Sequence, residues 1–130
     1  MAFGSAGGRG FGSNRREVLG GAGGGSIHLV IAHQMELGRP ISAVGLGGSM
    51  PSLGASGGGA GGSVLAVIGG EMQGSSNFDV SGGSSNFGNN DGGGGAGGAI
   101  AVYHGGALSG SRISNAGTGC VGSNVGTAVA

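Results

Sequence analysis

The side chains that could do chemistry are few and scattered along this chain. His28, His33 and His104 could bind a metal ion or transfer a proton, because imidazole ligates transition metals and titrates near neutral pH. These histidines occupy different positions of the repeat described below, so stacking the repeats would not bring them together. The sequence therefore predicts no metal site and no catalytic histidine.

The other candidate groups do not form a reactive set either. Asp79 and Asp91 have no partner carboxylate at a useful position, and Cys120 is the single cysteine, which excludes an intrachain disulfide and a cysteine metal framework. A buried, unreactive thiol and an interchain disulfide both stay open for Cys120. Patterns of the G-x-G-x-x-G type arise by chance in a glycine-rich chain, and we expect no helix after them to bind phosphate. We predict no enzymatic activity and no cofactor.

The composition excludes several classes of protein. Glycine supplies 39 of the 130 residues, but 2 prolines and no sustained G-x-y period exclude a collagen triple helix. The 5 basic residues balance the 5 acidic ones, so no basic patch indicates a nucleic-acid partner. A hydrophobic fraction of 37 % separates the chain from highly charged disordered tails. No apolar run reaches the roughly 20 residues of a membrane span.

A glycine run followed by an apolar run occurs three times. The phrases are "GAGGGSIHLV" from residue 21, "GGGAGGSVLAV" from residue 57 and "GGGAGGAIAV" from residue 93. Ile27, Val64 and Ile100 lie 37 and 36 residues apart in these phrases. The sequence therefore predicts one repeat domain, 1–130, whose parts are a partial tail of a preceding unit (1–20) and three repeats (21–56, 57–92 and 93–130).

Each repeat is expected to hold two strands. The first strand, "SIHLVIA" in the first repeat, alternates apolar and mixed positions, and a second anchor follows after a turn at Leu37-Gly38 and its counterparts. A period near 36 residues with two strands per unit is typical of stacked repeats, whose equivalent residues form ladders with a spacing of about 4.8 Å. The predicted stacking core is Ile27, Leu29, Ile41, Val64, Phe78, Ile100, Val102 and Ile113.

The fold class that follows is all-β: a glycine-rich β-solenoid, or parallel β-helix, of about three repeats of ~36 residues with no substantial helix. The one exception could be residues 14–19, "NRREVL", which either begin a short helix after Asn14 or form a charged insertion loop. The glycine runs need a role, because ordering glycine costs more backbone entropy than ordering alanine. We expect them to lie side by side in extended threefold, polyglycine-II-like conformations and to form a wall opposite the strands.

The phrases "GGGAGGSVLAVIGGEMQGSSNFDVSGG" and "GGGAGGAIAVYHGGALSGSRISNAGTG" resemble the glycine-rich right-handed parallel β-helix repeats of large secreted surface proteins. The resemblance covers residues 21–120, and the first repeat departs from it where "HQMELGRP" lengthens the turn. It implies an extracellular structural or adhesive role and no catalytic residues. A weaker similarity is to the polyglycine II sandwiches of phage tail-fibre adhesins and of a small antifreeze class.

These features predict a protein that assembles with itself. Both ends fall in the glycine-rich return phase, no polar caps are evident, and the neutral surface favours association. We expect a non-enzymatic, extracellular or cell-surface subunit that stacks head to tail into a filament. The alternative is a receptor-binding adhesin tip on a virion fibre, with a surface glycan or receptor as partner. Possible assembly contacts are Phe11, Phe87 and Cys120.

Overall fold

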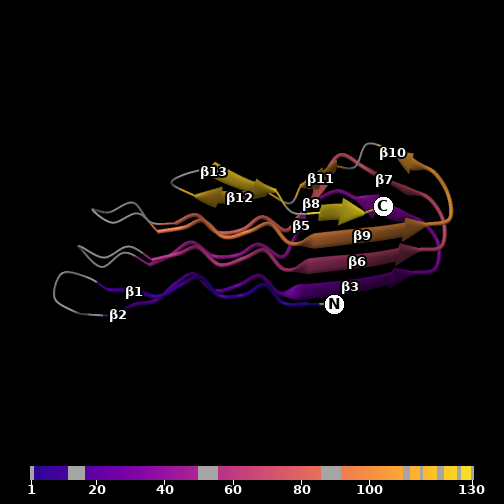
Figure 1. Cartoon of the computed structure of the whole chain (residues 1–130). Coiled ribbons are helices and arrows are strands. Elements are labelled where there is room, and N and C mark those ends of the chain that lie inside the picture. Colours follow the sequence, from indigo (N-terminus) through magenta and orange to yellow (C-terminus); the bar gives the residue numbers. More distant parts are fainter. Residues whose placement is uncertain are drawn as a thin grey trace.

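The computed structural model describes residues 2–11, 17–49, 56–85 and 92–109, together with the strand positions 112–114, 116–119, 122–125 and 127–129. All regular structure in this part of the chain is β-strand, and none of it is helix. The described part of the chain is therefore all-β, as the sequence predicts. Most of its strands fall into three parallel stacks, and extended glycine segments continue from these stacks towards one side (Figure 1).

The largest stack is a parallel sheet that contains the long strand of each repeat. Strands β3 (Ser26–Ile31), β6 (Ser63–Ile68) and β9 (Ala99–His104) pair in register, and β14 (Thr127–Val129) adds to the free side of β9. Ile27 pairs with Val64, and Val64 pairs with Ile100, so residues one repeat apart lie beside each other. Aliphatic and β-branched residues favour this extended pairing.

Two smaller parallel sheets complete each repeat. One contains β4 (Met35–Leu37), β7 (Met72–Gly74) and β10 (Leu108–Ser109), and the other contains β5 (Ile41–Ser42), β8 (Asn77–Asp79) and β11 (Arg112–Ser114). The sequence predicts a turn at the positions of the first of these sheets, and that prediction is wrong. Two or three residues are too few to show an alternating pattern, and their pairing comes from neighbouring repeats.

Two antiparallel pairs lie outside these stacks. Strand β1 (Gly10–Phe11) pairs with β2 (Glu17–Val18), and β12 (Ala116–Gly119) pairs with β13 (Gly122–Val125). The helix or loop expected over residues 14–19 is therefore strand at its Glu17–Val18 end, and residues 12–16 lie outside the described part.

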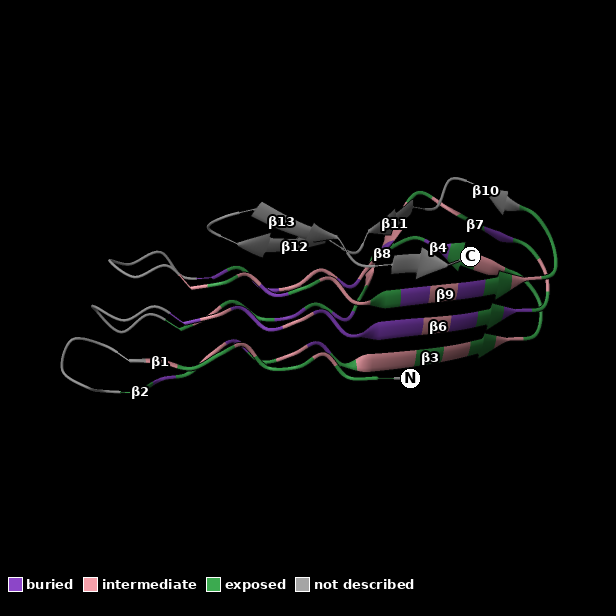
Figure 2. Ribbon diagram, in the orientation of Figure 1, coloured by how far each residue is buried: buried purple, intermediate pink, exposed green. Residues whose placement is uncertain are grey.

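The hydrophobic core lies between the three stacks. Its buried residues alternate along the strands and include Val64, Ala66 and Ile68 of β6, while Phe78 of β8 has no exposed surface. The equivalent residues of β3 are only partly buried, because no described strand covers the outer edge of β3. Figure 2 shows this change from buried β6 to half-exposed β3.

The glycine segments run on from the strands and leave the core behind. The return segments (20–25, 56–62 and 92–98) lead into β3, β6 and β9, and the outgoing segments (43–49 and 80–85) leave from β5 and β8 (Figure 1). A separate N-terminal segment (2–8) leads into β1. The expected position of the glycine runs, as a wall opposite the strands, is therefore wrong. The two smaller sheets occupy that place, because only larger apolar side chains fill the core.

Hydrogen bonds join the glycine segments with a step of three residues. The N–H groups of residues 57 to 62 donate, in chain order, to the carbonyl oxygens of Gly8, Gly93, Leu46, Ser5, Ala96 and Ala43, at 2.7–3.1 Å. Successive donors thus point to three different neighbouring segments, and every third donor returns to the same one. Extended backbone with three residues per turn produces this arrangement.

Close approach explains why glycine occupies most of these positions. A Cβ atom at Gly58 or Gly95 would overlap the backbone of the adjacent segment, whereas Ala60 and Ala96 sit where a methyl group fits. Gly74, at the corner after β7, has a φ of 141°, which L-residues with a side chain rarely adopt.

Candidate interaction surface

The structure keeps the ionisable candidates apart. His28 and His33 are exposed, and His104 Nδ1 lies 2.7 Å from the carbonyl oxygen of Gly106. One carboxylate oxygen of Asp79 accepts two hydrogen bonds from Ser81, one from its backbone N–H at 2.9 Å and one from its hydroxyl. Asp79 therefore stabilises a local turn. No group of three metal-ligating side chains lies together in the described residues. No described segment is a helix that is long and apolar enough to cross a membrane.

The stacking residues that the sequence singled out lie in three ladders. Their partners are Ile27 with Val64 and Ile100, Leu29 with Ala66 and Val102, and Ile41 with Phe78 and Ile113. Of the three expected assembly contacts, Phe11 falls in the described part. Phe11 pairs with Glu17 in a short hairpin, and Phe87 and Cys120 lie outside the described part.

Strand β3 forms one edge of the main sheet. The carbonyl oxygens of Gly25 and Ile31 accept hydrogen bonds from Ser63 and Gly69 of the next repeat. Because backbone groups alternate in direction along a strand, the N–H of His28 points away from β6 and towards the open edge. An edge of this kind is a template for pairing with another strand.

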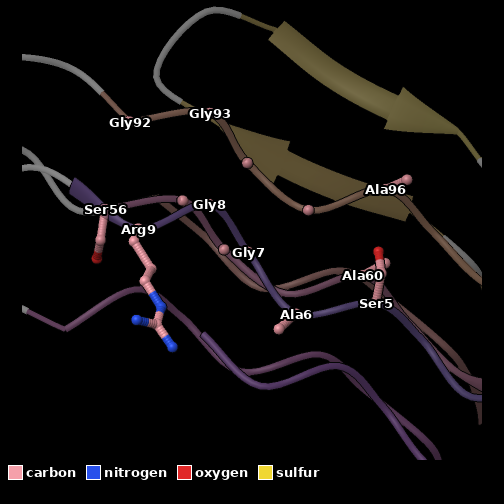
Figure 3. Close-up of a pocket in the computed structure, with 14 residues that line it drawn as sticks. Ser5, Ala6, Gly7, Gly8, Arg9, Ser56, Ala60, Gly92, Gly93 and Ala96 are labelled. Atoms are coloured by element: carbon pink, nitrogen blue, oxygen red, sulfur yellow. The ribbon is translucent and has the colours of Figure 1, made fainter. Parts of the chain in front are cut away.

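A groove lies among the glycine segments. Its volume is about 520 Å³, and its walls come from three places in the chain: residues 5–9, residues 56–60 and residues 92–96 (Figure 3). Most of the lining is backbone and small side chains. Arg9 is the lining residue with a charge, and its guanidinium forms a 2.6 Å ion pair with Glu17.

Backbone groups at the groove and beside it have no hydrogen-bond partner among the described residues. The carbonyl oxygens of Gly58 and Gly61 accept no hydrogen bond from any described residue, although the N–H groups of both residues donate. The segment 57–62 contacts five other glycine segments through hydrogen bonds, and the groove lies between two of them, 2–8 and 92–98. A threefold extended chain can have six such neighbours, so the groove is where a sixth would lie.

The outer face of the main sheet carries an exposed apolar column. Val30, Val67 and Tyr103 pair in register across β3, β6 and β9, and they alternate with the buried positions. Ser63, on the same outward-pointing set of positions, donates from its hydroxyl to the carbonyl oxygen of Ala2 at 2.8 Å. The N-terminal segment therefore begins on the same face as this column.

We expect Ser63→Ala to loosen the N-terminal segment. Ser63 is 8 % exposed, and its hydroxyl also lies 2.9 Å from the hydroxyl of Ser26. The substitution removes the side-chain hydrogen bond that holds the carbonyl oxygen of Ala2. The free energy of unfolding should fall by about 1 kcal/mol in urea titrations, as for loss of a typical hydrogen bond. Amide exchange should accelerate at Gly4 and Gly7. Ser26→Ala, which keeps the bond to Ala2, is the control and should leave that exchange unchanged.

Sequence reasoning missed the groove and the apolar column. The column has a signal, because Val30, Val67 and Tyr103 share one repeat position, but that position also suits an ordinary solvent-facing residue. The groove has none, since glycine runs look alike whether their neighbours are present or missing. Comparisons with protein-family models, curated proteins and solved structures found no match to this chain.

Proposed function

We propose that this chain is a non-enzymatic structural subunit that assembles end to end into an extracellular filament or surface fibre. Its architecture in this proposal is a β-solenoid whose rungs continue into polyglycine-II-like segments. In-register parallel pairing of residues 36 or 37 positions apart supports the solenoid. The three-residue step of the glycine hydrogen bonds supports the polyglycine II description.

The observation that carries the proposal is the edge at β3. Ile27, Leu29 and Ile31 are partly buried there, whereas their partners Val64, Ala66 and Ile68 in the next strand are buried. A strand added in register to β3 would satisfy outward backbone groups and cover the apolar ladder in one step. Contacts between unlike ends of a chain produce an open filament when they do not close into a ring.

We expect His28→Pro to block this assembly while leaving the fold intact. The N–H of residue 28 faces the open edge, so proline removes no hydrogen bond to β6, and proline is tolerated on edge strands. Electron microscopy of the unaltered chain should show filaments with an axial advance of roughly 14–19 Å per subunit, from three to four strands at about 4.8 Å. The proline variant should give at least tenfold fewer filaments at the same concentration.

The matched control is His28→Thr, which also removes the imidazole but keeps the backbone N–H and extended preference. It should assemble like the unaltered chain. Unaltered chains that stay monomeric in concentrated sedimentation runs would overturn the end-to-end proposal. Equal filament formation by the proline and threonine variants would overturn the role of the β3 edge.

A further inference from the structure

Hydrogen-bond donors and acceptors alternate around the second return segment. The carbonyl oxygens of Gly57 and Ala60 accept from the first return segment, and the N–H groups of the same two residues donate to the N-terminal segment. The N–H groups of Gly58 and Gly61 donate to the third return segment, and Gly59 bonds to both outgoing segments. The alternation calls for an acceptor pair at the groove, between the N-terminal segment and the third return segment. The carbonyl oxygens of Gly58 and Gly61, which accept no described hydrogen bond, are that pair.

The other two walls of the groove supply donors. Gly93 and Ala96 stand one repeat after the two residues that donate to the N-terminal segment, so their N–H groups point into the groove (Figure 3). Ser5 and Gly8 of the N-terminal segment accept from the second return segment, and the same alternation turns their N–H groups towards the groove. None of these four N–H groups makes a described backbone hydrogen bond. The groove therefore offers two acceptors and four donors.

The N-terminal segment shows how a chain occupies the equivalent position one repeat earlier. The N–H groups of Gly4 and Gly7 donate at 2.8 Å to the first return segment, to the two carbonyl oxygens that precede those of Gly61 and Gly58 by one repeat. Its carbonyl oxygens accept from the second return segment at 2.9 and 3.1 Å. An occupant of the groove with the same bonds would run parallel to the N-terminal segment and antiparallel to the second return segment.

Close packing determines what kind of chain can enter. A Cβ at Gly4 would overlap the carbonyl oxygen of Ala60, and a Cβ at Gly7 would overlap that of Gly57. An occupant of the groove would meet the third return segment in the same way, so it needs glycine at every third position. The lining favours an uncharged chain, because its charged residue, Arg9, is already in an ion pair.

We infer that the groove binds an uncharged, glycine-rich segment of another polypeptide in the extended threefold conformation. Every described glycine segment of this chain already bonds to neighbours of its own, and the N–H groups of Gly4 and Gly7 in a folded second copy are likewise engaged. The occupant is therefore a segment without internal partners. The groove is complete within one chain, so the inference does not depend on end-to-end assembly. Six backbone groups would bond to the occupant: those of Ser5, Gly8, Gly58, Gly61, Gly93 and Ala96.

A capped peptide with the sequence of residues 2–8, "AFGSAGG", is the probe, because its backbone groups are free in solution. At a peptide concentration about ten times its Kd, amide exchange at Gly93 and Ala96 of the full chain should slow roughly tenfold, as read by fragmentation mass spectrometry. The matched control is the same peptide with Gly4→Val and Gly7→Val, which cannot pack as closely and should leave the exchange unchanged. An equal effect of the two peptides, or no effect of either, would overturn the proposal.

Gly93→Val tests the groove side of the contact. A Cβ at Gly57, one repeat earlier, would lie 3.1 Å from the nitrogen of Gly8, so a side chain at residue 93 points to where the occupant would lie. At Gly93 itself a Cβ meets no atom within 4 Å, so the fold should accept valine. The variant should lose the peptide's effect at Ala96. Gly38→Val, also open but outside the groove lining, should retain that effect, and equal protection in both variants would contradict the inferred site.

Two other occupancies have distinct results in the same measurement. Faster exchange at Gly4 and Gly7 on adding peptide would mean that the peptide displaces the N-terminal segment instead of filling the groove. Protection of Gly93 and Ala96 that rises with protein concentration, without peptide, would assign the groove to a second copy of the chain. Either result would overturn the proposal. Exchange is read at named residues in single chains and filaments alike, so failure of end-to-end assembly would leave this test decisive.

Discussion

Gly61→Ala is expected to destabilise the protein more than any other single methyl group added to it. A Cβ at this position would lie 2.7 Å from the carbonyl carbon of Val80 and 2.8 Å from the nitrogen of Gly98, and closer still to the oxygen of Val80. All three atoms belong to backbone, so no side chain can rotate away. The segments would have to separate, which would break the 2.8 Å bond from Gly61 to Ala96 and its neighbours. We expect a loss on the order of 3–5 kcal/mol in the free energy of unfolding.

Gly25→Ala is the matched control, because a Cβ there meets no atom within 4 Å. Where the folded chain accepts the methyl group, alanine restricts the unfolded chain and stabilises by about 0.4–1 kcal/mol. Urea titrations of the two variants should therefore change in opposite directions. Similar midpoints for both variants would show that the glycine segments do not lie as close together as the structure places them.

Phe78→Ala is expected to have the second large effect. The ring has no exposed surface, lies in the middle strand of its stack, and is flanked in register by Ile41 and Ile113. Truncation leaves a cavity between rungs whose backbones are fixed by pairing on both sides, so the site collapses poorly. The expected loss is about 3–5 kcal/mol, the range for large aromatic residues in closely packed cores.

Leu46→Ala controls for the loss of an apolar side chain as such. Leu46 is 59 % exposed, and its contacts to neighbouring segments come from backbone groups that alanine retains. Its free energy of unfolding should change by no more than about 0.5 kcal/mol. Thermal melts and urea titrations of both variants measure the difference. A small loss for Phe78→Ala would mean that the core between the three stacks is not closely packed.

The repeat determines much of what the sequence could predict. The spacing of Ile27, Val64 and Ile100 gives the long strands and their pairing, because each strand has the same length and apolar phase. The bonding between glycine segments also follows from composition, since uncharged runs without side chains can satisfy their backbone groups only on one another. The strands at Met35 and Met72 were missed, because their pairing partners are short and lie a whole repeat away.

The candidate surfaces depend on placement that local pattern does not encode. The sequence shows the outward-facing apolar residues at one repeat position but not that Ala2 is held beside them by Ser63. It shows six similar glycine segments but not which of them are neighbours. The side on which residues 2–8 lie follows from contacts with residues 21–24 and 57–60, and those contacts depend on how the rungs stack.

The sequence by itself determined an all-β chain with repeats of about 36 residues, apolar ladders and glycine segments that bond to each other. These features follow from short-range physics. The alternation of apolar and polar residues sets which side of a strand is buried, and the absence of Cβ atoms in glycine permits close backbone approach. Only the tertiary structure decided that the glycine segments extend beyond the core, that β3 is left as an edge, and that a groove lies beside Gly58 and Gly61. These features depend on which segments are neighbours in space. Strand β3 is an edge because no described strand pairs with its outer side, and the groove exists because no described glycine segment lies beside the carbonyl oxygens of Gly58 and Gly61.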